Sequence, residues 1–243
     1  MTAHSGAPSR PIRWYGDSVR DGIPYLHDLE VRGRLIVIEG PDASGRSTQI
    51  DLITTTLEAA GHAVLNTGLK RSDLISQGIL EAKRNTALGK RTLALYYAAD
   101  FADQLEHKII PALQAGFIVL SDRYIYTLMA RNTVRGIPRS WSHDLYSFAM
   151  VPDMVFYLDV DPYKLVHRVF QKHRSLDYYE SGSDMALSDD MFESFIIYQK
   201  KIAKEFEIMK DRYGLLHMDG GMGAEQVNDM LQERISAFLD KYG

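Results

Sequence analysis

Short apolar runs alternate along the chain with longer segments in which apolar residues recur at helical spacing. The runs are only a few residues long and hold almost no charge, as in strands that are buried on both faces of a parallel sheet. They predict strands at residues 35–38, 63–65, 117–120, 154–158 and 215–218.

The segments between these runs predict helices. One should begin near Ser47, carry Ile50, Ile53 and Leu57 on one face, and end at Gly61. Further helices are expected at residues 73–84, 91–115, 141–150, 163–173, 191–213 and 224–242, with a kink or restart at Pro111 and an acidic cap at Asp189 and Asp190. Strands that alternate with helices indicate an α/β fold with a parallel sheet covered on both faces.

Two stretches show no such period. Residues 1–33 hold three prolines and four glycines, so we expect an N-terminal extension that wraps on the domain or is partly disordered. Residues 34–243 then form one domain, in which a polar segment at about 174–190 separates two helices.

Composition excludes several classes of protein. With 243 residues and 45% hydrophobic residues, the chain can bury the core of one α/β domain. A formal net charge of -4 gives no basic field for nucleic acid or for an anionic membrane. No cysteine is available for disulfides or thiolate metal sites, and the eight histidines are scattered without zinc-ligand spacing. We expect a cytoplasmic protein without a signal peptide.

The first predicted strand runs into a glycine-containing turn at residues 39–48, which a helix follows. Gly40 and Gly45 allow the backbone to turn tightly and to point its N–H groups inward, where the N-terminus of the next helix adds a positive dipole. Ser47 stands where a phosphate-binding loop places the hydroxyl that ligates magnesium. Arg46 stands where that loop usually has lysine, and it supplies a permanent but bulkier cation.

A second candidate group follows the third strand, at Asp122, Arg123 and Tyr124. Ligands of such sheets gather at the carboxyl ends of the strands. An aspartate there can hold magnesium or its water, and an arginine can bind a phosphate with two parallel hydrogen bonds.

These segments together resemble the thymidylate kinase family over roughly residues 34–240. The resemblance is carried by residues 38–49, by Tyr97-Ala98-Ala99-Asp100, and by residues 110–116, 121–124 and 151–160. It implies a P-loop NTPase-type three-layer sandwich with a five-stranded parallel sheet and a lid. It also implies a homodimer that transfers the γ-phosphate of ATP, with Mg²⁺, to a nucleoside monophosphate for nucleotide biosynthesis.

The resemblance also implies roles for individual residues. The nucleotide-binding loop comprises Gly40, Asp42, Ala43, Ser44, Gly45, Arg46, Ser47 and Thr48, and magnesium falls to Ser47 and Asp122. Arg123 is matched to the acceptor phosphate, with Tyr124 beside it, and Tyr97 is matched to the aromatic that stacks on the acceptor base. Arg168, Lys172 and Arg174 are expected to close from the lid onto the transferred group.

The chain departs from the family at the acceptor pocket. Phe101 replaces an arginine that reads the thymine carbonyl, and Arg131 stands where a tyrosine borders the sugar. The stretch 67–72 replaces a glycine-rich segment, and its Lys70 and Arg71 could supply replacement cations. Because a missing hydrogen-bond partner weakens discrimination, we expect an acceptor pocket unlike an ordinary thymidylate pocket and a preferred acceptor other than thymidylate.

We therefore expect in-line phosphoryl transfer, which depends on positioning and charge neutralisation rather than on a strong base. Two alternatives stay open. One is a nucleotide-binding or regulatory protein with little activity, and the other is a kinase with a non-nucleotide phosphorylated acceptor or a polyphosphate donor.

Overall fold

A five-stranded parallel sheet forms the centre of the molecule, in strand order β4-β5-β3-β6-β7. We describe it from a computed structural model, which describes residues 8–16, 29–84, 88–173, 178–179 and 181–242. The strands are β3 (Arg34–Glu39), β4 (Val64–Gly68), β5 (Ile118–Asp122), β6 (Met154–Asp159) and β7 (Leu216–Asp219). All five predicted strands are confirmed, as is the α/β class.

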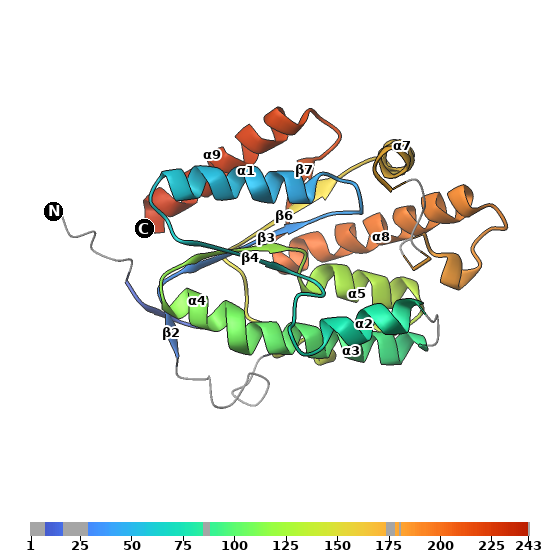
Figure 1. The fold of residues 1–243 in the computed structure, drawn as a ribbon, viewed down its shortest axis with the longest axis horizontal. Coiled ribbons are helices and arrows are strands. Elements are labelled where there is room, and N and C mark those ends of the chain that lie inside the picture. The colour runs from blue at the N-terminus through green and yellow to red at the C-terminus, as the bar shows by residue number, and fades with distance from the viewer. Residues whose placement is uncertain (1–7, 17–28, 85–87, 174–177, 180, 243) are drawn as a thin grey trace.

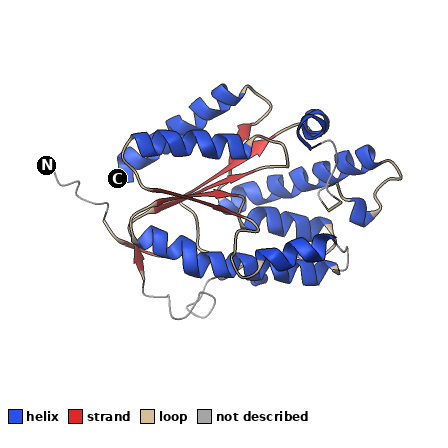
Figure 2. Ribbon diagram, in the orientation of Figure 1, coloured by secondary structure: helices blue, strands red, loops and turns tan. Residues whose placement is uncertain are grey.

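Helices cover both faces of the sheet (Figures 1 and 2). On one face lie α1 (Arg46–Ala59) and α9 (Ala224–Tyr242); on the other lie α3 (Lys90–Gln104), α4 (Ile110–Gln114), α5 (Ile125–Val134) and α8 (Met191–Tyr213). Because side chains alternate along a strand, Ile36 and Ile38 of β3 join the first core, and Leu35 and Val37 join the second.

Three further helices complete these layers. α2 (Ser76–Arg84) packs on α3, α6 (Arg139–Leu145) on α5, and α7 (Pro162–His173) on α8. The side chain of Asp190 accepts hydrogen bonds from the N–H groups of Phe192 and Glu193, so it caps α8 as predicted. Among the described residues, no helix has both the length and the apolar character that crossing a membrane would require.

The predicted break at Pro111 is a change of helix type. A π-helical turn, Leu105–Ile109, joins α3 to α4, and Pro111 lies in the first turn of α4. Proline has no N–H to donate to the preceding turn, so the regular hydrogen-bond pattern must change there.

Two sequence-based assignments of helices were wrong. Helix α5 was missed because it is buried on nearly all sides and therefore shows no polar stripe. The helix expected at residues 141–150 is α6, which ends at Leu145; beyond it, Met150 forms a bridge with Trp14.

The described part of the N-terminal extension packs on the domain. Strands β1 (Arg10–Pro11) and β2 (Glu30–Val31) pair antiparallel. Arg10 forms an ion pair of 2.5 Å with Asp153, whose carboxylate also accepts the N–H of Leu35. This contact fixes the extension at the end of β3 opposite the glycine-rich turn.

Candidate active site

The glycine-rich turn connects the carboxyl end of β3 to α1. Gly40 has a φ of +153°, and a Cβ there would lie 2.8 Å from Ser44 Oγ and 2.9 Å from the carbonyl oxygen of Leu158. Gly45 has a φ of +100° and caps α1. Glycine is therefore required at both positions, and the first backbone N–H groups of α1 form the anion-binding end of a helix.

The side chain of Arg46 points back beneath the turn, and it is buried. Its Nη1 donates to the carbonyl oxygens of Gly40, at 2.6 Å, and Pro41. Its Nε donates to Asp122 Oδ1 at 2.7 Å. Burial and the neighbouring Arg123 lower the pKa of Arg46, while Asp122 and Asp42 oppose the change. The cation that replaces the usual lysine thus joins the turn to β5.

Asp122 is placed opposite the start of α1, as the sequence predicted. Its Oδ2 accepts a hydrogen bond of 3.3 Å from the hydroxyl of Ser47. Burial raises the pKa of Asp122, but Arg46 and Arg123 outweigh it, so the net shift is downward and favours the carboxylate. Mg²⁺ in kinases commonly uses one or two protein oxygens and completes its shell with water and phosphate oxygens. Ser47 and Asp122 fit this requirement, although no cluster of three acidic or histidine ligands occurs among the described residues.

Three arginines converge on the carboxylate of Asp42, within the turn. Arg123 Nη2 lies 2.5 Å from Oδ1, Arg131 Nη2 lies 3.3 Å from Oδ2, and Arg46 Nη2 lies 3.8 Å from Oδ1. Although burial alone would raise the pKa of Asp42, these arginines hold it well below its usual range. Three cations face two carboxylates, Asp42 and Asp122, so a positive charge is left over for an anionic ligand.

Glu39 supports this arrangement from inside the core. The carboxylate is fully buried and accepts hydrogen bonds from the N–H groups of Tyr124 and Thr127, at 2.9 and 3.2 Å, and from the Thr127 hydroxyl. It thereby ties the start of α5 to β3. Arg123, which precedes this helix start, has a φ of +72°, so its backbone is strained and needs such support.

Asp100 performs a similar task for the loop after β4. Its Oδ2 accepts the N–H of Lys70 at 2.8 Å, and its Oδ1 accepts the N–H of Ser72 at 3.0 Å. Arg71 lies between these anchors and helps to lower the pKa of Asp122. The loop that departs from the family pattern therefore brings at least one cation toward the site.

Two neighbouring cavities, together called the recess, lie beside helices α3 and α5. The inner cavity is narrow, about 20 Å³, and is bordered by Tyr97, Leu128, Arg131 and Asn132. The outer cavity measures about 500 Å³, within the range of small-molecule sites. Both are lined by Lys90, Leu93, Arg135 and Tyr179.

The acceptor residues expected from the sequence divide into two groups. Tyr97 and Arg131 border the recess. Phe101 and Tyr124 are buried and pack edge-to-face at 4.8 Å between ring centroids. Both line a crevice of about 10 Å³ beside Arg123, so Phe101 packs within the core rather than bordering the recess.

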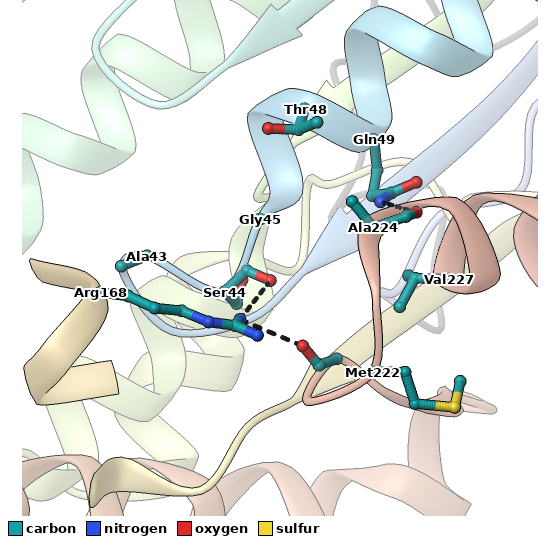
Figure 3. A pocket seen from close by; sticks show the side chains of 10 residues that line it. Ala43, Ser44, Gly45, Thr48, Gln49, Arg168, Met222, Ala224 and Val227 are labelled. Carbon is teal, nitrogen blue, oxygen red and sulfur yellow. Dashed lines mark hydrogen bonds between the residues drawn. The ribbon is translucent and has the colours of Figure 1, made fainter. Parts of the chain in front are cut away.

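A separate cavity of about 280 Å³ lies against the turn (Figure 3). Its walls include Ala43, Ser44, Gly45 and Thr48 of the loop and α1, with Met222 and Val227 opposite. Arg168 Nη1 donates to the carbonyl of Gly220 at 3.1 Å, and to that of Ser44 at 3.5 Å. Arg168 thus lines this cavity and does not line the recess. The side chain of Lys172 and all of Arg174 lie outside the described part of the chain, as does Asp177 of the expected lid.

Comparison with known proteins identifies the family. The family model described as "Thymidylate kinase" matches residues 38–229, which include the turn, Asp122 and both sets of cavity walls. The chain belongs to the thymidylate kinase family.

Individual proteins that are similar to the chain are described as thymidylate kinases as well. The chain is 34% identical over 211 residues to "Probable thymidylate kinase 2" of Saccharolobus solfataricus, a match that covers 86% of this chain and 99% of that protein. It is 34% identical over 146 residues to "Probable thymidylate kinase" of Thermococcus kodakarensis, covering 55% and 70% of the two chains. For "Thymidylate kinase" of Bacillus licheniformis the identity is 33% over 147 residues, covering 57% and 69%.

Sequence reasoning missed several residues that build this thymidylate kinase site. Asn132 borders the recess, Glu39 anchors α5, and Gly220 and Met222 border the cavity beside the turn. A carboxylate at the end of a buried strand, as at Glu39, is itself a signal, since buried charges need partners. Nothing in the local pattern indicated Gly220 or Met222, which come from the loop after the last strand.

Proposed function

We propose that this member of the thymidylate kinase family transfers the γ-phosphate of ATP to thymidylate, reading the base through a changed set of contacts. The observation that carries the proposal is the convergence of Arg46, Arg123 and Arg131 on Asp42, next to the glycine-rich turn. Transfer between two anions needs such a surplus of fixed cations.

The donor occupies the turn in this proposal. The N–H groups at the start of α1 and the guanidinium of Arg46 hold the terminal phosphates of ATP, and the nucleoside lies in the cavity beside Arg168. Ser47 and Asp122 would hold Mg²⁺, which when bound would supply charge neutralisation for the transferred phosphoryl group. Arg46 then exchanges some of its contacts with the loop carbonyls for contacts with phosphate.

The acceptor occupies the recess. Arg123 holds its phosphate, with Arg71 as a second cation, and the ring of Tyr97 stacks on the base. Arg131 replaces the tyrosine expected beside the sugar and keeps Asp42 ionised. The phosphate oxygen of the acceptor is already an anion, so no residue has to remove a proton from it.

An acceptor screen tests this function. Each ribo- and deoxynucleoside monophosphate is incubated with ATP and Mg²⁺, and ADP release is followed, with the Arg123→Ala variant as the blank. Contrary to the expectation from the changed pocket, membership of the thymidylate kinase family predicts that thymidylate gives the highest kcat/KM. No turnover above the blank for any monophosphate, with ATP still bound, would instead support a nucleotide-binding protein without kinase activity.

We further propose that the protein is cytoplasmic.

We also propose a homodimer that forms through α2 and α3. Large apolar side chains are exposed there: Leu74 before α2, Leu80 on it, and Leu95 and Tyr96 on α3. A Cβ at Gly78 would lie 3.2 Å from the Tyr96 ring, so the two helices present one surface. Sedimentation velocity should show a dimer that Leu95→Glu dissociates, and a wild-type monomer would contradict the proposal.

A further inference from the structure

The N-terminal extension reaches helix α5 through one tyrosine. Residues 8–16 precede the part of the chain that the family model matches. Their backbone pairs with the segment that leads into β6: the N–H of Tyr15 donates to the carbonyl of Ala149 at 3.0 Å, and the N–H of Val151 donates to the carbonyl of Arg13 at 2.7 Å. These hydrogen bonds on both sides of Trp14 fix the position of Tyr15.

The side chain of Tyr15 contacts two helices of the domain. Its hydroxyl forms a hydrogen bond with the hydroxyl of Tyr126, in the first turn of α5, and its ring lies edge-on to Tyr213 of α8 at 5.4 Å between centroids. Tyr126 is completely buried, and among the described residues Tyr15 is the one hydrogen-bond partner of its hydroxyl. Because a buried hydroxyl needs a partner, the extension completes the packing of α5.

This contact lies close to Arg123. Tyr126 follows Arg123 by three residues, and the φ of +72° at Arg123 is a strained conformation that its surroundings must hold. Tyr124, between the two, donates its hydroxyl to the carbonyl of Met150 at 2.9 Å, and Met150 also forms the bridge with Trp14. The extension therefore supports the helix start beside Arg123 both directly and through this segment.

We propose that Tyr15 is a positioning residue that keeps Arg123 in place for the acceptor phosphate. The inference rests on the proposed function, in which Arg123 holds that phosphate. Loss of the Tyr15 hydroxyl leaves the Tyr126 hydroxyl buried without a partner, and the first turn of α5 then shifts to satisfy it. Arg123 moves with this turn, whereas the N–H groups at the start of α1, which bind the donor, do not.

The test compares the KM values for thymidylate and for ATP in full-length variants. Tyr15→Phe should raise the KM for thymidylate about three- to tenfold and leave the KM for ATP within about twofold of the wild type. A double variant with Tyr15→Phe and Tyr126→Phe has no unpartnered hydroxyl and should recover most of the loss. Arg10→Ala, which breaks the ion pair with Asp153 in the same extension, is the control; it should lower the melting temperature and leave both KM values unchanged.

Three results would overturn the proposal. A Tyr15 that only stabilises the fold would give a lower melting temperature in Tyr15→Phe without separating the two KM values. A double variant at least as impaired as Tyr15→Phe, or an equal rise in the KM for thymidylate in Arg10→Ala, would also contradict it. If Tyr15→Phe does not fold, Tyr126→Phe removes the same hydrogen bond. It should raise the KM for thymidylate by a smaller factor, because the half-buried Tyr15 hydroxyl can reach water.

Hydrogen exchange separates this proposal from the proposed function, because it needs no turnover. In Tyr15→Phe the amides of the first turns of α5 should exchange faster than in the wild type, while those of α1 exchange at the same rate. Unchanged exchange in α5 would refute the positioning role. Failure of the wild type to phosphorylate thymidylate would refute the proposed function instead.

Discussion

The Nε atom of Arg46, at the start of α1, lies 2.7 Å from Oδ1 of Asp122, at the end of β5. This ion pair joins the phosphate-binding loop to the carboxylate expected at magnesium. The same guanidinium holds the carbonyl oxygens of Gly40 and Pro41. Arg46 therefore both shapes the loop and supplies its charge.

Removal of that charge should abolish most activity. We expect Arg46→Met to lower kcat by about 10²–10³-fold, the usual effect of losing one donor to developing charge. Arg46→Lys keeps a cation on a shorter stem and should retain activity within about tenfold of the wild type. Steady-state ADP release at saturating ATP and thymidylate measures both. Equal losses in the two variants would show that the guanidinium geometry, rather than its charge, is required.

Asp42 should make the folding stability depend on pH in the acidic range. Because its pKa is lower in the folded protein than in the unfolded chain, its contribution is complete above the unfolded value of 3.8 and is lost as the pH falls below it. Asp42→Asn should cost about 1–3 kcal/mol at pH 7, since three arginines lose a shared partner that is itself partly exposed. Urea unfolding between pH 3 and 7 should show a smaller acid-dependent loss of stability in the variant. Parallel curves would contradict this role.

Glu39 should make the folding stability depend on pH in the opposite direction to Asp42. Burial raises its pKa in the folded protein, against the hydrogen bonds from Thr127 and Tyr124, so its stabilising contribution is present below the unfolded value of 4.5 and is lost as the pH rises through the folded value. Glutamine can accept the same N–H groups without a buried charge. The stability of Glu39→Gln relative to the wild type should therefore improve from pH 5 to pH 8 in urea unfolding. A relative stability that worsens with pH would indicate a carboxylate that needs its charge.

Replacement of Arg168 should weaken the binding of ATP and leave the binding of thymidylate unchanged. Its guanidinium lies between the carbonyls of Ser44 and Gly220, at the cavity beside the turn (Figure 3). We expect Arg168→Ala to raise the KM for ATP about tenfold, the loss of a charge-assisted contact, with little change in the KM for thymidylate. Arg234→Ala, an exposed arginine on α9, serves as the control. A rise confined to the KM for thymidylate would place Arg168 at the acceptor instead.

Much of this site could be predicted from the chain because local chemistry determines it. Gly40 and Gly45 have backbone conformations that other residues rarely adopt, and Asp122 and Arg123 follow a buried strand. What could not be predicted depends on contacts between distant segments. Arg131 and Asp42, which form an ion pair, are 89 positions apart in the sequence. Arg131 lies on α5, a helix that has no polar stripe by which the sequence could reveal it. The contacts of Arg168 with the carbonyls of Ser44 and Gly220 likewise join segments that are far apart in the sequence.

The most direct measurement follows the transferred phosphoryl group. The protein is incubated with thymidylate, Mg²⁺ and ATP labelled at the γ-phosphate, and the nucleotides are separated. The account predicts label in thymidine diphosphate, in a one-to-one ratio with the ADP formed, and none above background with Arg123→Ala. Label that stays in ATP, or that appears only as inorganic phosphate, would contradict it.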